Sequence, residues 1–334
     1  MDDLQFGTRN KRGDWAPTQH LDLPPFWSWP PRLGRVAGWV AGYLWPWNLV
    51  TIATALLWWH FVVPDTDTLR TLQWDWALTL FAANWLGLFA YYGCFEWRYY
   101  RRRVQDRQFK YNGKFPAEQP SDVFWFRSQN IDNFLRSFFV SIPIGTAIEV
   151  FLLWALANGW APTVSWDEHA AYVVALVALA PILHEVHFFV IHRLIHWGPL
   201  YRWVHSVHHN SVNPSPWSSM SMHPVEGFAY FGVALWVLVI PSHPFLAVFL
   251  FHAAAFGAIV GHLGFDQLAL PGGAAQKSSA YAHYLHHKHF EVNYCDNGAV
   301  PLDQWFGSWH DGSPEGERRM QERFRRKKEK LNAA

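Results

Sequence analysis

The sequence predicts an all-α integral membrane protein whose helices cross the bilayer about four times. Of its 334 residues, 51% are hydrophobic and 22 are tryptophan, and tryptophan accumulates where the bilayer meets water. Four apolar runs are long enough to span a hydrocarbon core of about 30 Å. Fifteen of the 19 histidines fall within residues 184–289. The net charge is only +1. Nucleic-acid-binding proteins are usually strongly basic, so no nucleic-acid partner is expected.

The first two apolar runs take the chain across the membrane and back. Residues 1–35 are polar and then proline-rich, and we expect them to form a tail at the membrane surface. Transmembrane helices are predicted over residues 36–63 and 76–95. Arginines cluster directly after the second run, between residues 98 and 110, which places this end on the cytoplasmic side under the positive-inside rule.

The next two runs return the histidine-rich stretch to the cytoplasmic side. Transmembrane helices are predicted over residues 134–156 and 170–191, and the link between them carries acids but no lysine or arginine. Glu149 falls at membrane depth in the third run. An acid there is a candidate functional residue, although pairing with a neighbouring helix is the favoured interpretation. The fourth run leads directly into His192.

Residues 227–260 form a further apolar stretch that Pro241 and Pro244 interrupt. Its two predicted helices, of about 14 to 16 residues, are short for full crossings, so a re-entrant or interfacial hairpin is as plausible as two spans. Either arrangement leaves both ends on the cytoplasmic side. Residues 315–334 are densely charged and are expected to form a solvated or headgroup-facing tail. One membrane domain is therefore expected over residues 36–314.

Three histidine motifs predict a metal site. They are His192-Arg-Leu-Ile-His196, His205-Ser-Val-His208-His209 and His283-Tyr-Leu-His286-His287. Residues three or four apart project from one helix face and can reach a common ion. The last ring of each triplet, about 100° around the helix from its neighbour, can reach a second ion. Lone histidines in apolar runs, such as His60 and His252, are interpreted as packed residues.

Imidazole alone leaves the metal open, because it suits zinc, copper, iron and nickel. Eight or more nitrogens exceed the needs of one ion, so two metals are the natural count. Cys94 and Cys295 fit no Cys-x-x-Cys zinc pattern, and no segment resembles the His-Glu-x-x-His of zinc proteases. Excess imidazole at a membrane face therefore favours a redox metal and dioxygen.

The histidine motifs and their surroundings resemble the sterol desaturase and fatty acid hydroxylase superfamily of integral membrane di-iron enzymes. The likeness runs from Glu185 to Gly307 and looks strongest to sterol C-5 desaturases and their bacterial relatives. Besides the three motifs, the matching segments are Tyr201-Arg-Trp-Val, His223-Pro-Val-Glu226-Gly227, Gly261-His262-Leu-Gly264, Asn293-Tyr294 and Leu302-Asp303-Gln-Trp305-Phe306-Gly307.

The resemblance implies a cytosolic helical cap, residues 192–226 and 261–310, that holds two irons. Family members use dioxygen and two external electrons to hydroxylate or desaturate a C–H bond of a lipid, sterols included. Carried over by position, the ligands are His192, His196, His205, His208, His209, His262, His283, His286 and His287. His223 is expected as a tenth ligand or as a neighbour of one, and Glu185 and Glu226 as orienters of ligand imidazoles. Zinc readily occupies such nitrogen sites in purified samples.

Two departures from the family pattern bear on the substrate rather than on the metals: Phe189 replaces a common tyrosine, and Cys295 replaces a common glycine. Leu270-Pro-Gly-Gly273 lacks the histidine of a fused cytochrome b5 domain. The resemblance therefore implies a separate ferredoxin-like or cytochrome b5-like donor with its reductase. This donor would dock on the cytoplasmic face of a bacterial inner membrane or of the endoplasmic reticulum. The arginine cluster and the basic C-terminus are candidates for that contact, or for binding anionic membrane lipids.

Two other classes of function stay open. A membrane zinc hydrolase acting on lipids would need a water-activating carboxylate, for which Glu185 and Glu226 are the local candidates. A histidine-rich metal transporter should carry its ligands at membrane depth, whereas these motifs lie beyond the apolar runs. Hydroxylation and desaturation begin with the same hydrogen abstraction, so the ligand residues do not distinguish them.

Overall fold

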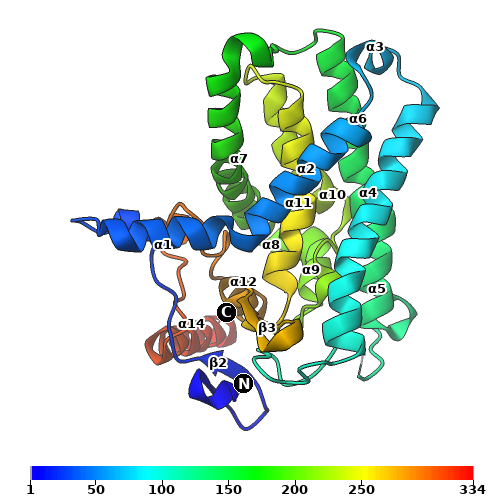
Figure 1. Ribbon diagram of the computed structural model, residues 1–334. Helices are drawn as coiled ribbons and strands as arrows, with labels where there is room; N and C mark the ends of the chain where they lie inside the picture. Colours follow the sequence, from blue (N-terminus) through cyan, green and yellow to red (C-terminus); the bar gives the residue numbers. More distant parts are fainter. Residues whose placement is uncertain (1, 117, 334) are drawn as a thin grey trace.

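The computed structural model describes residues 2–116 and 118–333, and helices dominate this part of the chain (Figure 1). The longer helices are α1 (Leu33–Tyr43), α2 (Leu49–Phe61), α4 (Trp74–Phe95), α5 (Gln129–Arg136), α6 (Ile142–Ala157), α7 (Trp166–Ile195), α10 (Pro224–Phe231), α11 (Phe245–His262), α12 (Tyr281–His289) and α14 (Pro314–Ala333). The short ones are α3 (Thr66–Leu69), α8 (Gly198–Leu200), α9 (Ser206–His209) and α13 (Leu302–Trp305).

Short β-strands and segments of 3₁₀ or π helix complete the secondary structure. Two antiparallel hairpins pair β1 (Gly7–Arg9) with β2 (Trp15–Pro17) and β3 (Gln267–Ala269) with β4 (Ala275–Lys277). Segments of π or 3₁₀ geometry extend several helices, namely η3 (Leu44–Asn48), η4 (Glu96–Arg101), η6 (Ser137–Ser141), η7 (Tyr201–His205) and η9 (Gly232–Leu238).

Five helical segments of the described chain are long and apolar enough to cross a membrane, which confirms the predicted membrane bundle. They are Leu33–Phe61, Trp74–Arg101, Gln129–Ala157, Trp166–Ile195 and Phe245–His262. The second, third and fourth segments contain the runs predicted over residues 76–95, 134–156 and 170–191. The protein is therefore an integral membrane protein.

The first apolar run is bent rather than one continuous helix, which corrects the prediction of a single helix over residues 36–63. The backbone leaves the helical region at Trp45, with φ −96° and ψ 132°. A residue before proline avoids the α region, and Pro46 has no N–H to donate. As a result α1 projects sideways from the bundle while α2 runs along it (Figure 1), and no residue of α1 is buried.

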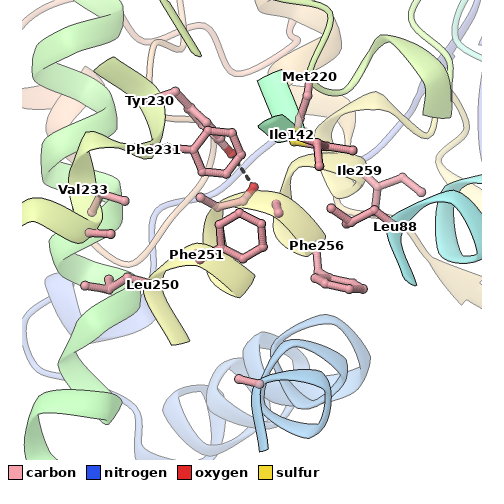
Figure 2. Packing of buried hydrophobic residues seen from close by; sticks show 14 of the residues in the cluster. Leu88, Ile142, Met220, Tyr230, Phe231, Val233, Leu250, Phe251, Phe256 and Ile259 are labelled. Atoms are coloured by element: carbon pink, nitrogen blue, oxygen red, sulfur yellow. Dashed lines mark hydrogen bonds between the residues drawn. The ribbon is translucent and has the colours of Figure 1, made fainter. Parts of the chain in front are cut away.

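Helix α11 lies at the centre of the bundle and packs against α2, α6 and α7 (Figure 1). Its 18 residues reach the length of a membrane span, whereas α10 and η9 before it are shorter. The two halves of the stretch predicted as a hairpin are therefore unequal. Figure 2 shows Phe231 of α10 beside Phe251 of α11, with ring centroids 5.4 Å apart. Tyr230 also donates a hydrogen bond of 2.7 Å to the Ala254 carbonyl.

A polar cluster joins α2, α4 and α6 inside the bundle. Glu149 is fully buried, and its carboxylate accepts a hydrogen bond of 2.7 Å from the Asn84 side chain. The Asn84 amide also donates to Thr146 at 3.0 Å and accepts from Trp58 Nε1 at 2.7 Å. The interhelix pairing favoured for Glu149 is therefore present, and a single asparagine links three helices.

The β1–β2 hairpin packs on the cap, a contact that the prediction of a surface tail over residues 1–35 did not include. Trp15 is buried, with its ring centroid 5.5 Å from that of Phe109 and 6.3 Å from that of Tyr111. Leu285 of α12 belongs to the same cluster. The partners of Trp15 are distant in the sequence, so local composition could not predict this packing.

Replacing Asn84 with leucine should lower the free energy of unfolding by about 1–2 kcal/mol, because the Trp58 N–H and the Glu149 carboxyl would lose their partner. Thermal unfolding in detergent measures the change. Leu86→Ala, at an exposed position of the same helix, is the control. An Asn84→Leu protein as stable as this control would contradict the structural role of the cluster.

Candidate metal centre

Nine histidine rings meet where the ends of α7 and α11 approach α9 and α12. They form two groups, and within each group one possible ligand atom per residue lies within 4.8 Å of the others. The first group is His192, His196, His205, His209 and His286, and the second is His208, His262, His283 and His287. The structure thus brings together nine of the ten histidines predicted as ligands.

The division of each triplet differs from the prediction. His205 and His209 share the first group while His208 enters the second, although residues three apart were expected to share an ion. In the second triplet, His283 and His287 again share a group. With 3.6 residues per turn, a spacing of four leaves two rings about 40° apart and a spacing of three about 60° apart. Rings four residues apart are therefore better aligned than rings three residues apart, and they are the ones that share a group.

Neighbouring rings in both groups point Nε2 at one another. In the first group the Nε2–Nε2 distances are 3.0 Å for His192–His205, His205–His209 and His209–His286, and 3.2 Å for His196–His209. In the second group they are 3.3 Å for His208–His262, 3.2 Å for His262–His283 and 3.1 Å for His283–His287. Each group therefore has a common centre surrounded by Nε2 atoms.

Six of these rings hold a proton on Nδ1, because that nitrogen faces an oxygen. The acceptors are the carbonyls of Tyr294 for His192, Val292 for His286, Ala258 for His262 and Ser221 for His208, and the carboxylates of Glu226 for His205 and Asp296 for His283. These Nδ1–O distances run from 2.6 to 3.3 Å. A neutral imidazole that donates from Nδ1 has its lone pair on Nε2.

Facing lone pairs repel unless a cation lies between them. His192 and His205 both donate from Nδ1, yet their Nε2 atoms are only 3.0 Å apart. The same holds for His262 and His283 at 3.2 Å. A metal about 2.1 Å from two nitrogens at right angles would place them about 3.0 Å apart. The residues present in both groups therefore fit bound metal.

Burial keeps the cap imidazoles neutral, which is the form that binds metal. It lowers the pKa of His208 to about 3 and that of His196 to about 2. For His205 and His286, burial and neighbouring imidazoles hold the pKa well below 6.5. Near neutral pH these rings are therefore ready to accept a cation without first losing a proton.

Glu226 has the contact that was predicted for it, and Asp296 is a second residue of the same kind. Glu226 Oε1 lies 2.8 Å from Nδ1 of His205, and Asp296 Oδ1 lies 2.9 Å from Nδ1 of His283. Asp296 was missed because it lies in a loop, where helical spacing gives no signal. Its position two residues after the matching Asn293-Tyr294 segment was the one available sequence signal.

Two predicted site residues lie apart from the rings. His223 belongs to neither group and caps the N-terminus of α10, where its Nδ1 accepts the N–H of Val225 at 3.3 Å. The Glu185 carboxylate accepts the N–H groups of Ala299 at 2.8 Å and Val300 at 3.1 Å. Glu185 therefore fastens the loop after α12 to α7 instead of orienting an imidazole.

Two of the matching motif positions support the rings indirectly. Asp303 accepts the N–H groups of Tyr294 and Cys295 at 2.9 Å each, which fixes the loop whose carbonyl receives the His192 proton. Gly261 lies against the His283 ring, and a Cβ there would be 2.9 Å from His283 Cγ. Glycine therefore allows α11 to approach α12 closely.

Of the two histidines interpreted as packed residues, His252 is buried and His60 is exposed. His252 contacts the Thr54 hydroxyl through Nδ1 at 3.0 Å. His187, which the sequence left unplaced, donates from Nε2 to the Ala229 carbonyl at 2.9 Å. His184 lies in neither ring group and is stacked on Phe188.

Removing either orienting carboxylate should weaken metal binding mainly in one of the two ring groups. We expect Glu226→Ala to lower the metal affinity of the first group, and Asp296→Ala that of the second, by roughly 10- to 100-fold. Metal titration with elemental analysis measures both effects. Glu168→Ala, an exposed acid at the far end of α7, is the control. Unchanged affinity in both carboxylate variants would contradict their orienting role.

Comparison with known proteins finds a family model and relatives that are similar to this part of the chain. The fatty acid hydroxylase family model matches residues 177–308, which include all nine rings. A Delta(7)-sterol 5(6)-desaturase of Gibberella zeae is 27% identical over 193 residues, which cover 57% of this chain and 59% of that protein. One of Aspergillus fumigatus is 26% identical over 239 residues, covering 63% and 69%. One of Saccharomyces cerevisiae is 32% identical over 107 residues, covering 32% and 28%.

The chain thus spans 59% of the length of the Gibberella zeae relative. No solved structure matches it significantly. The family model over residues 177–308 and these relatives agree with the resemblance of the histidine motifs to the sterol desaturase and fatty acid hydroxylase superfamily.

Proposed function

We propose that the protein is a membrane-bound, dioxygen-dependent di-iron oxidoreductase that hydroxylates or desaturates a C–H bond of a lipid of the sterol class. The observation that carries this proposal is the pair of all-imidazole groups at the end of a membrane helix. His192, His196, His205, His209 and His286 would hold one iron, and His208, His262, His283 and His287 the other. The relatives named as sterol desaturases support the class of reaction.

Iron bound in both groups would supply dioxygen activation and abstraction of hydrogen from an unactivated C–H bond. The protein's own residues fix the rings. Glu226 and Asp296 hold the Nδ1 protons of His205 and His283, which keeps each Nε2 lone pair directed at the metal. Two phenylalanines shield the centre from water. Phe188 stacks on His192 with ring centroids 4.6 Å apart, and the Phe290 centroid lies 4.9 Å from that of His209.

The arrangement of carboxylates favours this chemistry over lipid hydrolysis. A zinc hydrolase needs a carboxylate that can activate a metal-bound water. Glu226 is buried against the outer nitrogen of His205, and Glu185 is occupied by backbone N–H groups. Neither of the two carboxylates proposed for hydrolysis therefore faces the centre of a ring group.

An apolar cavity of about 640 Å³ between α2, α7 and α11 supports a lipid substrate. Its lining includes Leu56, Trp59, Val173, Val177, Pro181 and Phe249. Val173, Val177 and Pro181 repeat every four residues and so form a stripe on α7. The same helix carries His192 eleven residues after Pro181, about 17 Å at 1.5 Å per residue. A molecule seated in the cavity must therefore be long to reach the metals, as a sterol or an acyl lipid is.

The positive-inside rule supports a cytoplasmic metal centre. Tyr100, in the basic segment that ends the second span, donates a hydrogen bond of 3.0 Å to the carbonyl of Leu263, next to His262. The arginine cluster and the ring groups therefore share one end of the bundle. A separate ferredoxin-like or cytochrome b5-like donor would deliver electrons at this face, in a bacterial inner membrane or in the endoplasmic reticulum.

His208→Ala and His286→Ala each remove one ring, one from each group, and should abolish turnover and lower the metal content. The measurement is conversion of a lipid extract by the purified protein with dioxygen and a chemical reductant. Turnover that persists without dioxygen or reductant would favour the hydrolase. Unchanged product formation in both variants would refute the assignment of the centre.

Filling the cavity should block the substrate without disturbing the metals. We expect Val177→Trp to lower turnover at least 10-fold, because its ring would occupy the cavity, while metal content stays at the wild-type level. Leu179→Trp, on the exposed side of α7, is the matched control. Equal turnover in the two variants would show that the substrate does not enter through this cavity.

A further inference from the structure

A third cluster of ligand-type side chains lies outside the two ring groups. His289, His310 and Glu317 each place one ligand atom within 4.8 Å of the others. His289 is the last residue of α12, His310 lies in the loop before α14, and Glu317 lies on α14. None of the three residues lies in the segments that carry the resemblance to the family, and the cluster does not depend on the proposed lipid chemistry.

The two imidazoles are buried and arranged side by side. His289 is 6% exposed and His310 is 2% exposed. Their rings stack with centroids 5.0 Å apart and an interplanar angle of 16°. His289 ends α12 three residues after His286, but it belongs to neither ring group, and its Nε2 faces Glu317 of α14.

His310 has a buried nitrogen without a protein partner. Its Nδ1 accepts the N–H of Gly312 at 3.0 Å, whereas its Nε2 is buried and makes no hydrogen bond within the described chain. A buried polar nitrogen is normally paired. On the other side of the cluster, His289 Nε2 lies 3.1 Å from Glu317 Oε1, a separation suited to two ligands of one small cation.

We propose that His289, His310 and Glu317 form a third, mononuclear zinc site that fastens α14 to the end of α12. Two imidazoles and one carboxylate are a common zinc ligand set, with water in the fourth position. The Glu317 side chain is 32% exposed, which leaves access for that water. Binding through Nε2 moves the ring proton of His310 to Nδ1 and displaces the Gly312 contact, so zinc should bind here more weakly than in the ring groups.

Lys288 makes the proposal testable, because its ammonium also pairs with Glu317. An ammonium and a zinc ion compete for the same carboxylate. If the cluster is a zinc site, Lys288→Met removes a competing charge and should tighten zinc binding. If the cluster only holds α14 by an ion pair, the same substitution loosens the helix and leaves zinc binding unchanged.

The experiment uses the purified full chain in detergent, equilibrated with Zn²⁺ alone and analysed for zinc content. Wild type should hold about one zinc more per chain than His310→Ala or Glu317→Gln, and Lys288→Met should retain this zinc against a chelator concentration at least 5-fold higher. His169→Ala, at a half-exposed position on α7, is the control and should match wild type.

Two variants remove the proposed ligands, so a folding failure in one leaves the other informative. Glu317 lies partly exposed on α14, and glutamine keeps its shape. The proposal is overturned if Glu317→Gln holds as much zinc as wild type and Lys288→Met binds it no more tightly. A lower unfolding temperature in Lys288→Met without any change in zinc content would assign the cluster to an ion pair instead.

Discussion

Repulsion between facing imidazole lone pairs is the interaction on which the rest of this structure depends. Six rings donate from Nδ1 to carbonyls or carboxylates and so direct bare Nε2 atoms inward, where neighbours lie 3.0 to 3.3 Å apart. Such an arrangement is stable when cations occupy the two centres. The fold therefore needs rigid supports around the rings, and Asp303, Gly261 and the loop after α12 provide them.

Helix α7 connects the membrane to this centre. Its apolar stripe lines the cavity between α2 and α11, and its last turn carries His192 into the first ring group. Glu185, between these two parts, binds the loop after α12. The same helix thus faces the lipid-sized cavity, positions a ring and anchors the support of that ring. Under the proposed function, this helix would guide a long apolar substrate from the cavity to the metal centre.

Much of this arrangement was predictable from the sequence, because membrane spans and helical histidine motifs are local patterns. The clustering of the three histidine motifs and the pairing of Glu149 were expected from residue type and spacing, whereas the resemblance to the family implied His262 as a ligand and Glu226 as an orienter of imidazole. The bend at Trp45 was missed although Pro46 signalled it. Asp296, the role of Glu185 and the packing of Trp15 depend on loops that meet distant parts of the chain. No spacing rule could have located them.

We propose above that two metals share this nine-ring centre and react with dioxygen. The most direct measurement is the Mössbauer spectrum of the protein loaded anaerobically with ⁵⁷Fe, recorded before and after exposure to dioxygen. The account predicts two ferrous sites per chain in similar amounts, both of which become oxidised. A single iron site per chain, or two sites that stay ferrous in dioxygen, would contradict it.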